Sequence, residues 1–338
     1  MAHALDFSRG KAAIAYVGET PWHGLGQPLT PNQPLEVWQK EAGLDWKVQK
    51  ASLVYHPHSN PELALTMDNR CVLYRDDTNA ALGVVSDSHF KVVQPGEMLE
   101  FYRDLISDFG YSLETAGSLK GGQRIWALAN MGKNFRAGKD DELKSYLLFA
   151  TGMDGSFSTT VKLTSVRVVC NNTLSMAIPS ANGGKKEKTN LKAGVVNVSH
   201  RANFDAEAVK IALGLLPSQI KEFAEITKAL TGKQFTDRKA KEFFIELLVG
   251  AGADEEEANS VESRMNDLML AYTKGPGSDL ATAKGTAWGA VNAVTYFVDH
   301  VAGRARDTAL NKAWFGANDR LKTKALELAM DSAKLLAA

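Results

Sequence analysis

Cysteine is scarce in this sequence. Its 338 residues include two, Cys71 and Cys170, and these lie far apart. Two distant thiols make no disulfide framework of the kind that supports small secreted domains. No apolar run reaches the roughly 18 residues that a transmembrane helix needs, and residues 1–18 lack the continuous apolar core of a signal peptide. These absences predict a cytoplasmic protein that does not enter a membrane.

Short catalytic and cofactor motifs are also absent. The chain has no nucleophile elbow, HExxH zinc motif, CxxC pair, Rossmann fingerprint or phosphate-binding P-loop. His56 and His58 are close enough in sequence to share a metal, but no third ligand stands at a suitable spacing. The sequence therefore predicts no cofactor and no metal, and it favours a binding role over catalysis. An active site assembled from distant residues is the alternative.

Net charge is absent overall but not locally. The chain holds 39 basic and 39 acidic residues, in an otherwise ordinary globular composition that is 44% hydrophobic. Residues 162–201 are the exception, because this segment contains seven Lys or Arg residues and only one acidic residue, Glu187. A basic segment in a neutral protein indicates an anionic ligand.

Hydrophobic patterning divides the chain into three parts. Residues 1–35 are dense in glycine and proline and predict an irregular N-terminal arm. Residues 36–201 predict an α+β core with an antiparallel sheet, and residues 202–338 a helical region. Within the core the patterns predict a strand at 44–56, hairpins at 63–86 and 111–132, a helix at 95–109, strands at 145–152 and 157–163 joined by Asp154-Gly155, and a helix at 165–178.

The candidate binding residues gather around that last helix. Arg167 and Asn171 would lie one turn apart on its polar face, with Asn172 alongside. A basic loop follows, and further basic residues flank the unit: the full set adds Lys162, Lys185, Lys186, Lys188, Lys192 and Arg201. We expect these groups to bind phosphates or bases. The alternative is a solvated surface loop beside structural hydrogen bonds.

Arg124 and Trp126 form a second candidate pair. They are two residues apart on a predicted strand and so share one face. An arginine beside an aromatic ring suits a phosphate and a stacked base. A tryptophan packed on the core beside an arginine stem is the alternative, and the pattern favours it.

Several stretches together resemble a known family. They are TPWHGLG (20–26), AGSLKGG (116–122), LLFATGMDGSFSTTVKLTSVRVVCNNTLSMAI (147–178), SHR (199–201), TAWGAVNAVTYFVDH (286–300) and AWFG (313–316). The chain is similar to the phage/plasmid-like proteins of unknown function, and VRVVCNNTL is the most specific part of the likeness. This resemblance implies a cytoplasmic protein of a mobile element and brings no activity with it.

The order of the predicted elements resembles another group. A hairpin, two strands and a helix are similar to the β-β-β-α core of the single-strand annealing recombinases, of the Red-beta, RecT and Rad annealing types. That resemblance implies a basic groove that holds single-stranded DNA, and subunits that assemble into rings or filaments.

Three functions follow as expectations. The first is a single-stranded DNA binding and annealing protein of a phage or plasmid, acting in recombination or replication as a homo-oligomer. The second is an enzyme that processes a nucleotide or nucleic acid, with His23, His200 or His300 as acid or base. The third is an accessory protein that binds a host defence protein.

Overall fold

The fold is mixed α+β, as the sequence predicts. The computed structural model describes residues 5–18, 24–167, 172–175, 194–213, 216–302 and 317–333. Its larger sheet has the order β11-β10-β9-β7-β6-β1-β2, with β12 also paired to β10 and β8 to β9. The strands are β1 (Ile14–Val17), β2 (Gln27–Leu29), β6 (Ser112–Leu119), β7 (Arg124–Asn130), β8 (Phe135–Gly138), β9 (Asp141–Gly152), β10 (Thr159–Arg167), β11 (Asn172–Ser175) and β12 (Val195–Val198).

The centre of this sheet is an antiparallel meander of β6, β7, β9 and β10. Its tight turns occur where the sequence predicts them. The first runs through the 3-10 turn η2 (Lys120–Gly122), and the second passes through Gly155, which adopts a φ of +71°. Glycine takes such a conformation without the steric cost that a Cβ would bring. The predicted hairpin at 111–132 and the strand pair around Asp154 are confirmed.

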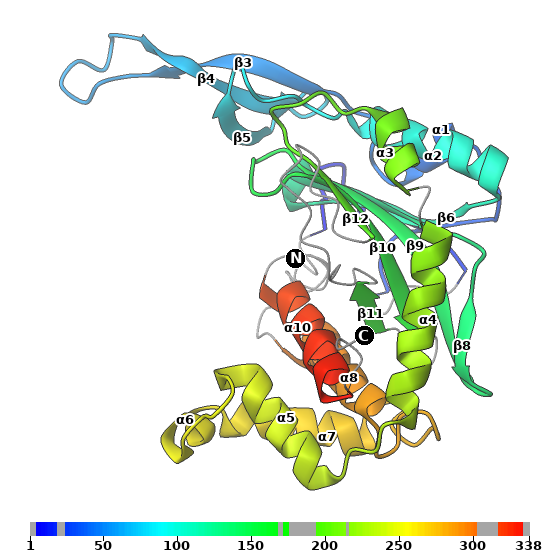
Figure 1. Ribbon diagram of the computed structural model, residues 1–338. Helices are drawn as coiled ribbons and strands as arrows, with labels where there is room; N and C mark the ends of the chain where they lie inside the picture. Colours follow the sequence, from blue (N-terminus) through cyan, green and yellow to red (C-terminus); the bar gives the residue numbers. More distant parts are fainter. Residues whose placement is uncertain are drawn as a thin grey trace.

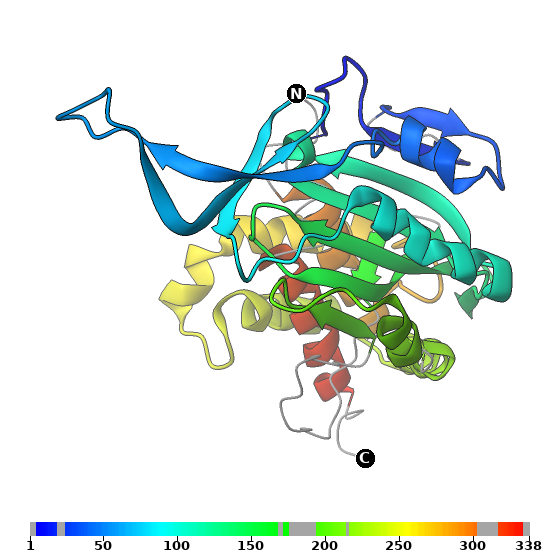
Figure 2. The ribbon, with the colours of Figure 1, turned by 90° about the horizontal axis from the view of Figure 1, so that it is seen from above.

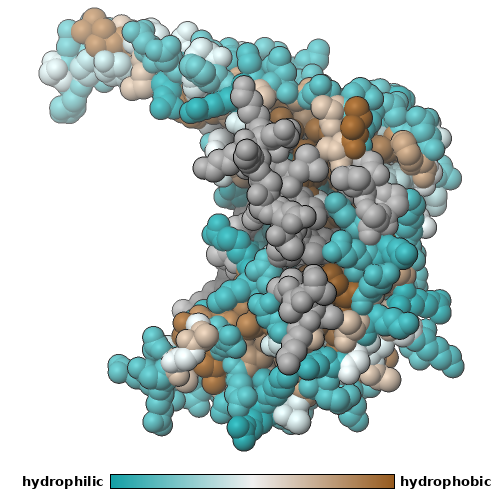
Figure 3. Space-filling model, viewed as in Figure 1, coloured by the Kyte–Doolittle hydropathy of each residue, from teal (hydrophilic) through white to brown (hydrophobic). Residues whose placement is uncertain are grey.

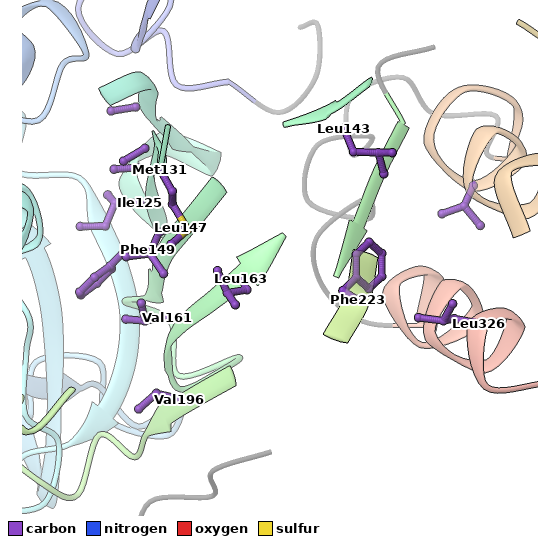
Figure 4. Close-up of a cluster of buried hydrophobic side chains, with 14 of the residues drawn as sticks. Ile125, Met131, Leu143, Leu147, Phe149, Val161, Leu163, Val196, Phe223 and Leu326 are labelled. Carbon is purple, nitrogen blue, oxygen red and sulfur yellow. The ribbon is translucent and has the colours of Figure 1, made fainter. Parts of the chain in front are cut away.

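Alternating residues of the meander face two different layers. Ile125, Ala127, Leu147 and Phe149 belong to the cluster shared with α2 (Pro95–Phe109), part of which is drawn in Figure 4. The hydroxyl of Tyr102 on α2 lies 2.9 Å from the Ala127 carbonyl oxygen and 3.1 Å from the Leu147 carbonyl oxygen. Period-two alternation therefore produces two apolar faces, and α2 covers one of them.

The helices lie on both sides of this sheet. Seen from above, α2 and α3 lie across one side and the C-terminal helices lie behind the other (Figure 2). The remaining helices are α1 (Leu35–Glu41), α3 (Ala206–Leu213), α4 (Leu216–Gly232), α5 (Asp237–Val249), α6 (Glu255–Ser260), α7 (Glu262–Lys274), α8 (Ala287–Tyr296), the π-helical turn η3 (Phe297–Val301) and α10 (Ala317–Ser332).

A buried carboxylate joins the helical region to the sheet. Asp141, at the start of β9, is 1% exposed and accepts hydrogen bonds from Thr282 Oγ1 at 2.6 Å and Trp288 Nε1 at 3.3 Å. Phe223 of α4 and Leu326 of α10 lie in the same apolar cluster as Leu143 of β9 (Figure 4). The helical region therefore attaches at the end of the sheet where β9 begins.

The predicted helix at 165–178 is wrong. Residues up to Arg167 continue β10, and Asn172–Ser175 form β11, which pairs antiparallel with it so that Arg167 lies opposite Asn172. The apolar spacing matches a helix, but the run contains the β-branched residues Val166, Val168, Val169 and Thr173, which favour a strand. The four-element β-β-β-α order that resembles the annealing recombinases therefore lacks this helix over the residues described.

The N-terminal segment also differs from its prediction. The sequence predicts an irregular arm at 1–35, yet β1 and β2 lie within it. β1 pairs antiparallel with β6 and parallel with β2, so it is an interior strand of the larger sheet. The dense glycines and prolines punctuate these short strands rather than exclude them.

A second sheet projects from the body. It consists of β3 (Val48–Tyr55), β4 (Leu65–Arg75) and β5 (Ala81–Ser86), all antiparallel. β5 pairs with β4 only from Arg70 to Tyr74, so the outer parts of β3 and β4 form a two-stranded ribbon. Figure 1 shows this ribbon as a long arm that points away from the larger sheet.

The base of the arm is held by a buried arginine. Arg75, at the end of β4, is fully buried and lies 4.4 Å from the centre of the Trp46 ring. Its guanidinium forms ion pairs with Asp6 and with Asp77, the latter at 2.7 Å. Burial raises the pKa of Asp77, but hydrogen bonds and charges from Arg75 and Arg9 outweigh that effect and lower the pKa from 3.8 to about 2.

We expect Asp77→Asn to destabilise the protein by about 1–2 kcal/mol at pH 7, which is the size of that pKa shift reduced for the access of solvent to the carboxylate. Because the folded-state pKa is depressed, this stabilisation is complete above pH 3.8 and is lost as pH falls toward 2. Urea unfolding at pH 7 and at about pH 2.5 should therefore show a smaller difference between variant and wild type at the lower pH.

Asp140→Asn, which changes an exposed turn carboxylate, is the matched control and should have little effect at either pH. An equal destabilisation by Asp77→Asn at both pH values would contradict this account of Asp77.

Candidate anion-binding site

A cationic pocket lies between the two sheets. It has a volume of about 670 Å³ and is bounded by β4 and β5, by the turn between β9 and β10, and by the residues after β12. Its lining comprises Arg70, Val84, Val85, Ser86, His89, Phe90, Asp154, Gly155, Ser156, Phe157, Ser158, Ser199, His200 and Arg201. We call it the anion pocket. It is built from segments that are distant in sequence.

Close backbone contact sets the floor of the anion pocket. A Cβ placed on Gly83 of β5 would lie 2.7 Å from the Cα of Asp154, closer than real Cβ atoms approach. Glycine at this position therefore lets the β9–β10 turn lie directly against β5. The turn carries Ser156, whose backbone N–H donates to Asp154 Oδ1 at 3.0 Å.

His200 fastens three segments of the pocket together. Its ring stacks on Phe90, with centroids 4.2 Å apart and planes 16° apart. Nδ1 lies 3.1 Å from the Lys91 carbonyl oxygen and Nε2 lies 3.1 Å from the Phe157 carbonyl oxygen. Carbonyl oxygens only accept, so the imidazolium satisfies both contacts and the neutral ring satisfies one.

The geometry does not support His200 as an acid or base, because both ring nitrogens contact main-chain carbonyls rather than the open pocket. The other two candidate histidines gain no support either. His23 lies outside the described residues, and the ring of His300 lies against Tyr296, with centroids 4.9 Å apart.

Arg124 contacts the turn between β9 and β10. Its Nη2 donates to Ser156 Oγ at 3.1 Å and lies 3.8 Å from Asp154 Oδ2, and its guanidinium is 5.6 Å from the Phe157 ring centre. Trp126 follows two residues later on β7 but is 2% exposed in the second apolar cluster. The packing alternative for Trp126 is therefore the one observed, and the ring cannot stack on a ligand without leaving the core.

Two exposed arginines line the pocket and come from different segments. Arg70 comes from β4 and Arg201 from the segment after β12. Within the described part of the chain neither guanidinium has a hydrogen bond or ion pair, whereas the one lining carboxylate, Asp154, lies beside Arg124. The lining of the pocket therefore combines an excess of positive charge with the hydroxyl groups of several serines. Such a set of donors suits an oxyanion.

Lys162 does not belong to this site. It is 4% exposed, lies on β10, and donates to Asp319 Oδ2 of α10 at 3.1 Å. A second buried pair, Lys322 with Asp299 at 2.8 Å, lies near enough to affect it. Burial lowers the pKa of Lys162, while the charges of Asp319 and Asp299 oppose that change. The ammonium therefore holds α10 against the sheet instead of facing solvent.

The other candidates fall outside the site or outside the description. Arg167 and Asn172 are opposite one another in adjacent strands, which replaces the expected helix face. Asn171, Lys185, Lys186, Lys188 and Lys192 lie outside the described residues. Of the predicted set, Arg201 lines the anion pocket, and Arg124 contacts the lining residues Ser156 and Asp154.

A comparison with known protein families places the chain. The family "Domain of unknown function (DUF932)" matches residues 81–315, more than half of the chain. The chain belongs to this family. No curated protein and no solved structure matches it. In this DUF932 member the family range contains every lining residue of the anion pocket except Arg70, which precedes it on β4.

Two other kinds of feature are absent from the described residues. No group of three or more His, Cys, Asp or Glu residues in that part of this DUF932 protein is arranged to hold a metal ion. None of the helices described is both long enough and apolar enough to cross a membrane.

Arg70 and His89 are two of the pocket residues that the sequence did not reveal. A repeated dipeptide was an available signal, since Ser88-His89 and Ser199-His200 both reach this pocket. His89 is exposed, and its Nδ1 lies 2.8 Å from Ser88 Oγ. No pattern in the sequence marked Arg70, because its position at the pocket depends on how the sheet of β3, β4 and β5 packs against the larger sheet.

We expect Lys162→Met to lower the free energy of unfolding by about 1–3 kcal/mol, because Asp319 loses its buried partner. Thermal or urea denaturation measures this loss. The double variant Lys162→Met with Asp319→Leu should recover most of it, since an apolar pair replaces an ion pair at little cost.

A single variant as stable as the wild type would show that the Lys162–Asp319 pair does not stabilise the protein.

Proposed function

We propose that this DUF932 protein binds single-stranded DNA, with backbone phosphates held in the anion pocket. The observation that supports this most strongly is the pair of exposed guanidinium groups, Arg70 and Arg201, which two distant segments contribute to the lining of one pocket. Each is without a partner among the residues described. A phosphate between them would receive two charge-assisted sets of hydrogen bonds.

The rest of the pocket chemistry agrees with a phosphate ligand. Ser86, Ser156, Ser158 and Ser199 contribute hydroxyl groups to its lining. Arg124 holds Asp154 close, which reduces the repulsion that this carboxylate would exert on an anion.

A polymer fits this site better than a free nucleotide. Both arginines are exposed, whereas a site for a small ligand encloses most of the ligand surface. The sequence before Arg201 also carries Lys185, Lys186, Lys188 and Lys192, which lie outside the described residues, and a basic stretch of this kind suits a polyanion such as single-stranded DNA. The exposed ring of His89 offers a surface on which an unpaired base can stack.

We further propose that this binding serves strand annealing in the recombination or replication of a phage or plasmid, in the cytoplasm. The phage or plasmid setting rests on the sequence resemblance to phage/plasmid-like proteins, and annealing rests on the proposed binding of single-stranded DNA. A fluorescence-transfer assay with two complementary labelled oligonucleotides tests annealing separately from binding. Binding without faster annealing would retain the first proposal and refute the second.

We expect Arg70→Gln and Arg201→Gln each to weaken binding of a labelled oligothymidine about fivefold, since each loses an exposed charge contact of roughly 1 kcal/mol. The slope of log affinity against log salt should fall by about 0.7 for each lost phosphate contact on a single strand. Fluorescence anisotropy over a series of KCl concentrations measures both quantities.

Arg238→Gln is the matched control. It removes the same charge from an 89% exposed side chain on α5, outside the pocket, and should leave affinity and slope unchanged. If all three variants behave alike, or if the wild type shows no salt-sensitive binding, the anion pocket is not a DNA site.

A further inference from the structure

The outer part of the arm is unusually apolar for an exposed segment. We call residues 53–67 the arm tip. Its large hydrophobic side chains are partly in solvent: Val54, Tyr55, Leu63 and Met67 are 48%, 47%, 44% and 46% exposed. Figure 3 shows hydrophobic surface at the far end of the arm, away from the body.

A ribbon of this kind is poorly stabilised by itself. β5 stops pairing at Arg70, so the two strands of the arm tip have no third strand among the described elements. Two-stranded ribbons in water are marginally stable, and exposed apolar groups on an unpaired edge promote contact with another chain. The arm tip therefore has the properties of a surface that a partner covers.

The charges of the arm tip favour a protein partner. Glu62 is its single Asp, Glu, Lys or Arg, and its other ionisable groups are Tyr55, His56 and His58. A two-stranded ribbon can enter the major groove of DNA, but phosphate contacts from Lys or Arg would have to hold it there. The arm tip has neither residue type, so its partner is better sought among apolar protein surfaces.

An apolar groove of suitable character lies on the helical region of this same chain. It has a volume of about 290 Å³ and is lined by Asp267, Leu270, Ala271, Lys274, Gly275, Pro276, Tyr296 and Val301. Leu270 and Val301 are 57% and 44% exposed. We call it the α7 groove.

The charges of the α7 groove complement those of the arm tip. Asp267, Leu270, Ala271 and Lys274 follow one face of α7, so an acid and a base stand at the two ends of an apolar stripe. Neither end is ion-paired within the described chain, and neither is Glu62. Lys274 can pair with Glu62 while Asp267 meets His58.

The arm tip and the α7 groove of one molecule are too far apart to meet. In Figure 1 the arm extends from the top of the molecule, whereas α7 lies at its lower end. A contact between them therefore joins two copies. It uses different patches on each copy, so it is heterologous, and it leaves a free arm and a free groove at the ends of every pair.

We propose that the arm tip of one copy docks in the α7 groove of the next, which builds a ring or a filament of this chain. The apolar side chains of the tip cover Leu270 and Val301, and the Glu62–Lys274 pair sets the direction of the ribbon. This assembly uses neither the anion pocket nor its ligand, so it stands or falls separately from DNA binding.

Cysteine cross-linking tests the contact directly. Val54→Cys in one preparation is mixed with Leu270→Cys in a second, affinity-tagged preparation, and the mixture is mildly oxidised. We expect a disulfide that joins position 54 of one chain to position 270 of another, about tenfold or more above any cross-linked product of unsubstituted chains oxidised alike. Of the native cysteines, Cys71 is buried and Cys170 lies outside the described residues, so the oxidised unsubstituted chain is the control for both. Cross-links that join two copies through position 54 alone, or no cross-links, would overturn the proposal.

Sedimentation over a range of concentrations tests the assembly. We expect wild type to form species larger than a dimer, and Tyr55→Ser with Met67→Ser to raise the dissociation constant of the contact about tenfold or more. Lys274→Glu should do the same, and Glu62→Lys combined with Lys274→Glu should restore assembly. Ile211→Ser, which alters a 77% exposed apolar residue elsewhere, is the control.

Circular dichroism confirms that each variant is folded. A wild type that is monomeric at every concentration, or a charge reversal that fails to restore assembly, would refute the docking. Assembly that appears only with DNA would assign the arm tip to a nucleic-acid complex instead and would also refute it.

Discussion

The burial of Arg75 is the constraint on which the positions of the other features depend. A guanidinium that is fully removed from water is stable only when carboxylates and hydrogen bonds replace its hydration. Asp6 supplies one carboxylate from the N-terminal segment and Asp77 supplies another from the turn after β4. These contacts tie the small sheet to the larger one. They therefore fix the direction of the arm and bring Arg70, five residues earlier on β4, to the wall of the anion pocket.

The anion pocket is a consequence of that docking rather than of any local motif. Gly83 allows the β9–β10 turn to touch β5, and His200 holds the segment after β12 against Phe90 and Phe157. Each contact joins parts of the chain that are distant in sequence. Positive charge then collects because Arg70 comes from β4 and Arg201 from the segment after β12, so no stretch of sequence displays the complete site.

Local signals in the sequence are reliable where local physics decides the outcome. Glycine at positive φ in the turns, alternation along β7 and β9, and apolar stripes on the C-terminal helices all predict elements that the structure contains. The run 165–178 is mispredicted because its apolar spacing fits a helix while its β-branched residues and its partner strand favour a sheet. Lys162 is misplaced for another reason: a charge in the sequence carries no information about burial, and Asp319 lies 157 residues away.

The strand β4 connects the two proposed surfaces physically. Met67 of the arm tip and Arg70 of the anion pocket are three residues apart on it, and β5 supports only the second of them. The pairing with the third strand ends at Arg70, so the ribbon beyond this residue has fewer backbone hydrogen bonds to hold it. Docking of the arm tip would immobilise the ribbon and hold the Arg70 side chain nearer to its phosphate-binding position. A pre-positioned cation loses less entropy when it binds, so an assembled protein would hold a DNA strand more tightly at each pocket than an isolated copy would.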